Sequence, residues 1–193
     1  MEGRFVTAIC YKEEDRITFM PASLRPYTPE NFPALYKLDQ ACYPAGIAYS
    51  KTTLRYFLGL KSADCLVTID DGRIVGFILT EENPPLAHII TLDVAEEFRR
   101  RGIGSALLAE SEKNLARRGV RHILLETAID NEAGIAFWKH HGYGVAATLK
   151  NYYLQRLDAY EMRKILVTVT IESTEFTHKS SKDHRNPLSG EKS

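Results

Sequence analysis

The chain has 193 residues, of which 44% are hydrophobic and 26% are charged. These values predict one globular domain, because the length is short for two separate cores. Lysine plus arginine and aspartate plus glutamate each number 25, so the net charge is zero and favours neither nucleic acid nor an anionic membrane as a partner. Three cysteines without CxxC spacing argue against a disulfide framework and a zinc site, so we expect no metal and a reducing, cytoplasmic location.

The two ends of the chain differ in composition from the middle. Residues 1–22 contain two short β-rich runs, which would form a hairpin or a loosely held extension. Residues 173–193 are expected to form a disordered tail, because Leu188 is the one aliphatic residue beyond Thr177. The domain itself is therefore predicted to span residues 23–172. No window has the apolar length of a signal peptide or a membrane span.

Two helices are predicted at the start of the domain. Thr28 followed by Pro29 is typical of an N-cap and a first helical position, so a first helix would run from there to Cys42. After a break at Tyr43–Pro44, Ser50 can cap a second, short helix. The residues expected to face the core from these helices are Phe32, Leu35, Leu38, Leu54, Phe57 and Leu58.

Strands are predicted next, and helices alternate with strands after them. The runs 65–69 and 73–80 are joined by Asp70, Asp71 and Gly72, a sequence typical of a hairpin turn. The later elements expected are a strand over 87–94, a helix that ends at Gly119, a strand over 121–127, a helix over 132–141, and closing strands over 143–149 and 162–172. The fold class is therefore mixed α/β.

The stretch VAEEFRRRGIGSAL, residues 94–107, predicts an anion site. Arg99, Arg100 and Arg101 stand at the start of a helix, where the helix dipole already places positive charge. An anion such as phosphate would relieve this repulsion. Gly102 and Gly104 carry no side chains, so backbone N–H groups there can reach phosphate oxygens.

Three phosphate-binding patterns can be compared with this stretch. A Walker loop, GxxxxGK followed by Ser or Thr, does not occur in the sequence. A dinucleotide fingerprint, GxGxxG, fails at Leu107, although Glu126 lies where the ribose-binding acid would be expected, so this pattern is a weak alternative. The third pattern, RxxGxG between a strand and a helix, is short and depends on its context.

That context is similar to a known family. The stretches HIITLDVAEEFRRRGIGSALL, LETAIDNEAGIAFWKHHGY and KNYYLQRLDAYEM, in this order, resemble the GNAT (general N-acetyltransferase) superfamily, specifically its N-terminal protein and ribosomal-protein alanine acetyltransferases. The resemblance spans about residues 23–166. It implies a mostly antiparallel mixed sheet flanked by helices, with acetyl-CoA bound where the parallel fourth and fifth strands splay apart. The implied acceptor is an amine, foremost the α-amino group of a protein or peptide N-terminus, with ribosomal proteins among the possible partners.

The resemblance also implies which residues contact acetyl-CoA. Leu92, Asp93 and Val94 would pair with the pantetheine arm through their backbone. The other implied contacts are Arg99, Arg100, Arg101, Gly102, Ile103, Gly104, Ser105, Asn131 and Trp138. Asn131 can equally cap the helix that follows it, and Trp138 can equally pack in the core beside Phe137.

Acetyl transfer needs a neutral amine, so a base must lie near the acceptor. By resemblance, His88 and Glu126 stand where the family places this base. A histidine with its ordinary pKa near ~6.5 suits the task, and burial would make a glutamate a better base. The simpler interpretation is that His88 begins a strand beside water and Glu126 is solvated at a strand end.

Trp138 stands where many relatives carry a tyrosine that protonates the departing thiolate, and an indole cannot supply that proton. Either the thiolate leaves without an acid, or Tyr143, Tyr152 or Tyr153 supplies the proton. Trp138 is also the main argument for a non-catalytic acyl-CoA-binding module.

The resemblance implies two aromatic walls around the acceptor, which suit a peptide because tyrosines combine apolar area with polar tips. The residues of these walls are Tyr43, Pro44 and Tyr49 on one side and Tyr152 and Tyr153 on the other. Acetylation of a small amine or of a lysine side chain is the alternative within enzymes, and an open groove in place of two enclosing walls would favour it.

Overall fold

The structure, a computed structural model, describes residues 23–44 and 46–166. These residues form a seven-stranded sheet in the order β1-β2-β3-β4-β5-β7-β6, in which every neighbouring pair is antiparallel except β4 and β5. The strands are β1 (Ser23–Pro26), β2 (Ala63–Asp70), β3 (Arg73–Asn83), β4 (Leu86–Val94), β5 (His122–Ala128), β6 (Gly144–Tyr153) and β7 (Leu157–Ile165). The helices are α1 (Phe32–Cys42), α2 (Lys51–Leu58), α3 (Ile103–Arg117) and α4 (Glu132–His140), with short 3-10 turns η1 (Pro29–Asn31) and η2 (Glu96–Phe98).

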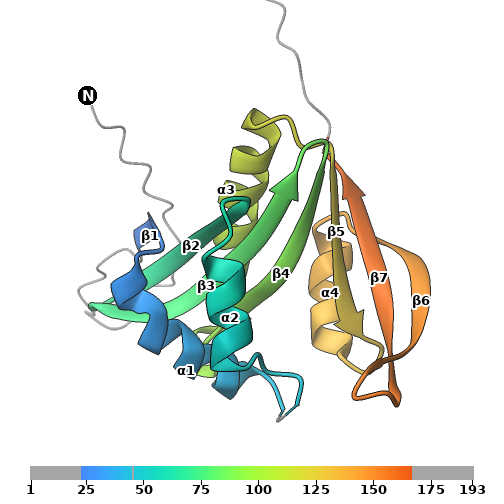
Figure 1. The fold of residues 1–193 in the computed structure, drawn as a ribbon, viewed down its shortest axis with the longest axis horizontal. Helices are drawn as coiled ribbons and strands as arrows, with labels where there is room; N and C mark the ends of the chain where they lie inside the picture. Colours follow the sequence, from blue (N-terminus) through green and yellow to red (C-terminus); the bar gives the residue numbers. More distant parts are fainter. Residues whose placement is uncertain (1–22, 45, 167–193) are drawn as a thin grey trace, which may run out of the picture.

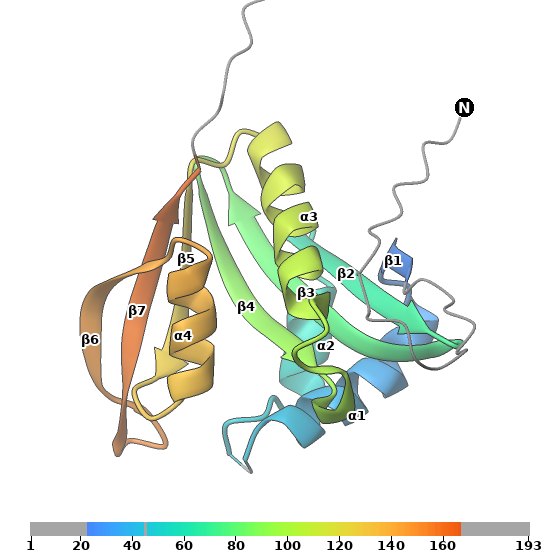
Figure 2. The same cartoon turned by 180° about the vertical axis from the view of Figure 1, so that it is seen from behind.

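The helices cover the sheet on both faces. Helices α1 and α2 lie on one face, over β2 to β4, and α3 and α4 lie on the other (Figures 1 and 2). Each face has its own apolar core, because burial of side chains from both layers is the main favourable contribution to folding. The α1–α2 core contains Phe32, Leu35, Leu38, Leu54, Val67, Phe77 and Leu79. The α3–α4 core contains Ile78, Ile89, Leu107, Leu108, Leu115, Ile123, Leu125, Trp138 and Met162.

Local sequence signals account for most element boundaries. Asp71 and Gly72 both have positive φ, 48° and 76°, which is the type I′ geometry that matches the twist of a hairpin. Ser50 accepts a hydrogen bond from the backbone N–H of Thr53 at 3.0 Å and so caps α2 as predicted. Gly119, with φ of 89°, ends α3 as predicted. The predicted α/β class and its parallel fourth and fifth strands are confirmed.

The structure corrects the predicted elements in three places. The first helix begins as the turn η1 and becomes α-helical at Phe32, and the four residues of β1 were not predicted. The closing strand, predicted over 162–172, begins already at Leu157. Charged residues of this strand are paired with other elements of the fold: Asp158 binds Lys150 at 2.6 Å, and Lys164 binds Glu112 at 2.6 Å.

The predicted N-terminal hairpin, the predicted tail and the last residues of the predicted domain lie outside the described residues. Among residues 23–44 and 46–166, no helix is long and apolar enough to cross a membrane.

Candidate active site

The site lies where β4 and β5 separate. The two strands pair in parallel only from Leu86 to His88 on β4 and from His122 to Leu124 on β5. Beyond these pairs they diverge, as both views show (Figures 1 and 2). A register shift between β3 and β4 leaves Ile90 as an extra residue on β4, and such bulges bend a strand away from its neighbour. In the described chain, no strand pairs with this edge of β4 beyond His88.

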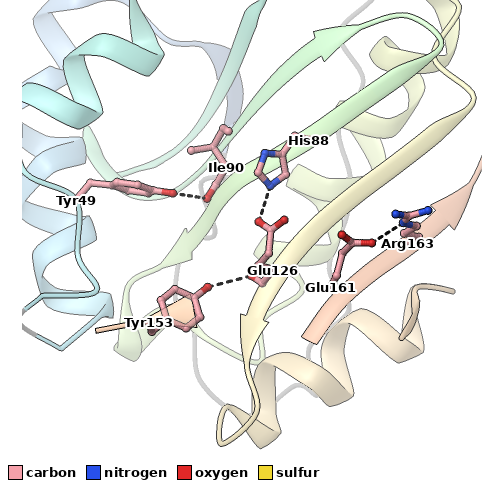
Figure 3. Close-up of polar contacts among 7 residues, drawn as sticks. All are labelled: Tyr49, His88, Ile90, Glu126, Tyr153, Glu161 and Arg163. Carbon is pink, nitrogen blue, oxygen red and sulfur yellow. Dashed lines mark hydrogen bonds and ion pairs between the residues drawn. The ribbon is translucent and has the colours of Figure 1, made fainter. Parts of the chain in front are cut away.

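His88 and Glu126 face each other at the point of divergence. His88 Nε2 and Glu126 Oε2 are 2.7 Å apart, although the residues are 38 positions apart in the sequence (Figure 3). The histidine side chain is 33% exposed and the glutamate side chain 14%, so solvent reaches the imidazole more easily than the carboxylate. The simpler interpretation was that water alone surrounds these two side chains. The structure differs from it, because His88 and Glu126 bind each other.

A second carboxylate stands beside Glu126. Glu161 on β7 is directly opposite Glu126 in the antiparallel register, so both side chains are on one face of the sheet. Two like charges in this arrangement repel each other. Arg163 donates from Nε to Glu161 Oε1 at 2.6 Å and offsets one of them (Figure 3). Sequence reasoning missed this pair, because only strand register places Glu161 opposite Glu126.

Two tyrosines approach the His88–Glu126 pair from different elements. Tyr49 donates its hydroxyl to the backbone oxygen of Ile90 at 3.2 Å, and Tyr153 donates to the backbone oxygen of Glu126 at 3.3 Å (Figure 3). Burial raises the pKa of Tyr49 to about 12, so this phenol stays un-ionised near neutral pH. Partial desolvation and the nearby Glu126 also raise the pKa of Tyr152, which is 48% exposed.

The loop before α3 has the backbone geometry of an anion-binding turn. Arg100 has a φ of 64° and Gly102, two residues later, a φ of 80°, and turns that contain left-handed residues can aim several N–H groups at one point. A left-handed arginine costs on the order of 1 kcal/mol, which makes it a candidate functional feature. Both residues are exposed.

The three arginines predicted to meet the anion are placed differently. Arg99 donates from Nε to the backbone oxygen of Val94 at 3.0 Å, which ties it back to β4. The guanidinium of Arg101 lies 4.9 Å from the ring centre of Phe98. All three arginines are exposed, and Arg100 is the one with a left-handed backbone. The first turn of α3 follows this loop directly. In that turn, Ser105 Oγ lies 2.9 Å from Nε2 of His141, the residue that follows α4.

Asn131 and Trp138 take structural positions. Asn131 Oδ1 accepts the backbone N–H of Gly134 at 3.0 Å, so the residue caps α4. Trp138 is buried, with its ring 5.0 Å from that of Phe137 and 5.3 Å from that of Tyr143. Tyr143, one of the candidate acids, is buried too and donates its hydroxyl to Glu112 on α3 at 2.9 Å.

The remaining predicted residues lie near Tyr49 or along β4. Tyr43 shares a hydrogen bond of 3.1 Å with Thr91, and Pro44 is exposed. Asp93 is 1% exposed and accepts a hydrogen bond from Thr91 at 2.6 Å. Leu92 packs against the α3–α4 core, Ile103 lies within it, and a Cβ on Gly104 would lie 3.4 Å from the ring of Phe137. Asp39, buried on the inner side of α1, was not predicted, although its place on the apolar face of that helix is a signal for it.

Comparison with known proteins identifies the fold and its family. The structure resembles that of Ard1 from Thermoplasma volcanium with a TM-score of 0.70 and 27% identity, over 76% of this chain and 99% of that one. The ribosomal-protein-S18-alanine N-acetyltransferase structure from Escherichia coli, at 23% identity, has the same fold, with a TM-score of 0.71 over 78% of this chain and 97% of that one.

Sequence comparison agrees. N-alpha-acetyltransferase 30 of Schizosaccharomyces pombe is 31% identical over 117 residues, which cover 58% of this chain and 78% of that protein. The [ribosomal protein bS18]-alanine N-acetyltransferase of Escherichia coli K12 is 28% identical over 123 residues, covering 64% and 81%. The sequence model described as acetyltransferase (GNAT) family matches residues 32–143, more than half of the chain. The chain therefore belongs to the acetyltransferase (GNAT) family.

Proposed function

We propose that this N-acetyltransferase transfers the acetyl group of acetyl-CoA to the α-amino group of a protein or peptide N-terminus. The observation that carries the proposal is the His88–Glu126 pair, 2.7 Å apart at the divergence of β4 and β5 and approached by Tyr49 and Tyr153. The similarity to N-alpha-acetyltransferases supports it.

The residues along β4 and before α3 suit acetyl-CoA. The unpaired edge of β4 at Leu92–Val94 offers backbone groups to an amide-containing chain, as an additional strand would use them. The left-handed Arg100 and Gly102 and the first turn of α3 offer N–H groups to a pyrophosphate. Because Arg99 is tied to the Val94 oxygen, we assign the exposed charge at this loop to Arg100 and Arg101. Bound acetyl-CoA supplies a thioester carbonyl that an amine can attack.

His88 is the group that we assign to accept the proton of the amine. With Glu126 ionised, the proton of their hydrogen bond belongs to His88 Nε2, which leaves Nδ1 as the acceptor of the imidazole. After His88 takes a proton, the Glu126 carboxylate stabilises the imidazolium. Glu126 is thus a positioning and charge-stabilising group, and it is a second proton acceptor if the amine reaches it directly.

The cost of removing the amine proton favours an α-amine over a lysine side chain. An α-amino group has an ordinary pKa of about 7.8 and a lysine of about 10.4, so deprotonating the lysine costs ~3.5 kcal/mol more. The smaller cost suits proton transfer to an imidazole that is hydrogen-bonded to a carboxylate. Tyr49 on one side and Tyr152 and Tyr153 on the other suit an enclosed chain end, with Tyr152 and Tyr153 as the phenols on this face that could protonate the thiolate.

The test is acetylation of a peptide library by the purified chain with acetyl-CoA, read by mass spectrometry. The library includes ribosomal-protein N-termini, free lysine side chains on blocked peptides, and small amines. We expect acetyl groups on α-amines, and we expect the His88→Ala, Glu126→Ala double variant to lose turnover at least a hundredfold while CoA binding, measured by calorimetry, changes less than threefold.

A matched control uses the same two residue types away from the site. The double variant His122→Ala, Glu110→Ala changes an exposed histidine at the start of β5 and a glutamate on α3. It should keep wild-type turnover. Full activity in the His88, Glu126 double variant would refute the assigned base, acetylation of lysine alone would refute the acceptor, and CoA binding without any transfer would refute catalysis.

A further inference from the structure

Two aspartates are buried behind Tyr43 and Tyr49. Asp39 on α1 is 0% exposed and Asp93 on β4 is 1% exposed. Each has one carboxylate oxygen with a hydrogen-bond partner, while Asp39 Oδ1 and Asp93 Oδ2 have none among the described residues. Burying an ionised carboxylate without a cation is expensive, so packing alone does not explain either residue.

Asp39 holds the backbone of Tyr49. Its Oδ2 accepts the backbone N–H of Tyr49 at 2.9 Å and a hydrogen bond from Gln40 Nε2 at 3.0 Å. Gln40 Nε2 also donates to the backbone oxygen of Tyr49 at 2.9 Å. The hydroxyl of the same tyrosine donates to Ile90 on β4. Tyr49 is therefore held at its N–H, its C=O and its phenol.

Asp93 holds the phenol of Tyr43 through one intermediate. Thr91 donates its hydroxyl proton to Asp93 Oδ1 at 2.6 Å. Because that proton is used, the bond of 3.1 Å between Tyr43 and Thr91 must have the tyrosine as donor. The order of donation is thus Tyr43 to Thr91 to Asp93.

The nearby cation does not neutralise this pair. The Arg99 guanidinium lowers the pKa of Asp93, but its Nε donates a hydrogen bond to the backbone oxygen of Val94. Burial first, and then the charge of Asp39, raise the pKa of Asp93 to about 7. The chain therefore keeps two buried carboxylates that each raise the cost of ionising the other. Their hydrogen bonds lead to Tyr49 and, through Thr91, to Tyr43, on one side of the acceptor site. This arrangement points to a role other than stability.

We propose that Asp39 and Asp93, the latter through Thr91, are positioning residues that hold Tyr49 and Tyr43 against β4 and thereby set the affinity for the acceptor. The inference rests on the proposed function, in which these tyrosines contact the acceptor. It assigns no proton transfer to the aspartates, since neither touches the His88–Glu126 pair in the structure.

The kinetic test removes the link through Thr91 without changing side-chain size. Thr91→Val and Tyr43→Phe are compared with the wild type on the best peptide from the library. We expect the acceptor KM to rise about fivefold or more in each, with kcat and the Kd for CoA within twofold, because a lost hydrogen bond is worth about one such factor. Thr91→Ser should restore the wild-type KM, and the double variant should be no worse than Thr91→Val alone.

The matched control is Tyr56→Phe, which makes the same change on an exposed tyrosine of α2, 63% exposed. It should leave the acceptor KM unchanged. An unchanged acceptor KM in Thr91→Val, or a fall in kcat at constant KM, would overturn the positioning role. So would additive effects of Thr91→Val and Tyr43→Phe in the double variant.

A second measurement needs no acceptor peptide and so separates the two proposals. Amide hydrogen exchange at Tyr49 should become at least tenfold faster in Asp39→Ala, while Asp39→Asn, which keeps an acceptor oxygen, should stay close to the wild type. Unchanged Tyr49 exchange in Asp39→Ala would overturn the inference. If amide exchange at Tyr49 becomes faster in Asp39→Ala but no peptide is acetylated, the proposed function is wrong and the positioning of Tyr49 by Asp39 is still supported.

Discussion

Asp93 makes folding depend on pH in a direction opposite to that of most acidic residues. Burial raises its pKa to about 7 from an ordinary value of 3.8, with Asp39 adding to the increase, while the hydrogen bond from Thr91, the nearby Tyr43 hydroxyl and the Arg99 guanidinium oppose it. The folded chain thus binds this proton more tightly than the unfolded chain does. Stability from this group is complete below pH 4 and is lost as the pH rises toward 7.

The magnitude follows from the same values. At about 1.4 kcal/mol per pKa unit, the difference between 3.8 and about 7 corresponds to ~4 kcal/mol of lost stability at pH 8, as an upper value. Asp93→Asn removes the charge and keeps an oxygen for Thr91, at a cost of about 1 kcal/mol for the weaker bond. We expect the variant to be more stable than the wild type by about 3 kcal/mol at pH 8 and by little or nothing at pH 4.

The assay is urea unfolding at pH 4, 5, 6, 7 and 8, followed by the fluorescence of Trp138. This is the one tryptophan of the chain and it is buried against Phe137 and Tyr143, so its emission reports loss of the α3–α4 core. Asp130→Asn, an exposed aspartate before α4, is the control and should follow the wild type. Equal pH dependence in the wild type and in Asp93→Asn would refute the argument that Asp93 is strained by burial.

Two further predictions concern the scaffold. Leu107→Ala should lower the free energy of unfolding by about 2–5 kcal/mol, because this side chain is 0% exposed in the α3–α4 core and its removal leaves a cavity. Urea unfolding with an unchanged m-value would show this loss. A loss below about 1 kcal/mol would contradict the packing. Gly119→Ala should cost about 1 kcal/mol in the same assay through its φ of 89° alone, since no atom beyond its chain neighbours lies within 4 Å of the added Cβ. Gly144→Ala is its control, because that glycine has equally open space and no positive φ, and equal costs at the two positions would exclude backbone strain as the cause.

Local sequence accounts for most elements of this fold. The Asp71–Gly72 turn, the Ser50 cap and the Gly119 stop are decided by the φ preferences and hydrogen bonds of a few adjacent residues, so the sequence predicts them directly. The arginine and glycine stretch before α3 was visible for the same reason. Resemblance to a family then singled out His88 and Glu126, which no local pattern could have joined.

Tertiary structure decided which side chains meet. The 2.7 Å contact of His88 with Glu126 depends on parallel pairing between strands far apart in the chain, and the position of Glu161 depends on register. The early start of β7 at Leu157 was not predicted, and charged residues of this strand find their partners in other elements. Propensity acts within a few residues, whereas pairing and burial act across the whole chain. The sequence alone therefore determined most of the elements, the family and the candidate base. The tertiary structure decided that two aspartates are buried behind the acceptor site and that Arg99 turns back to β4.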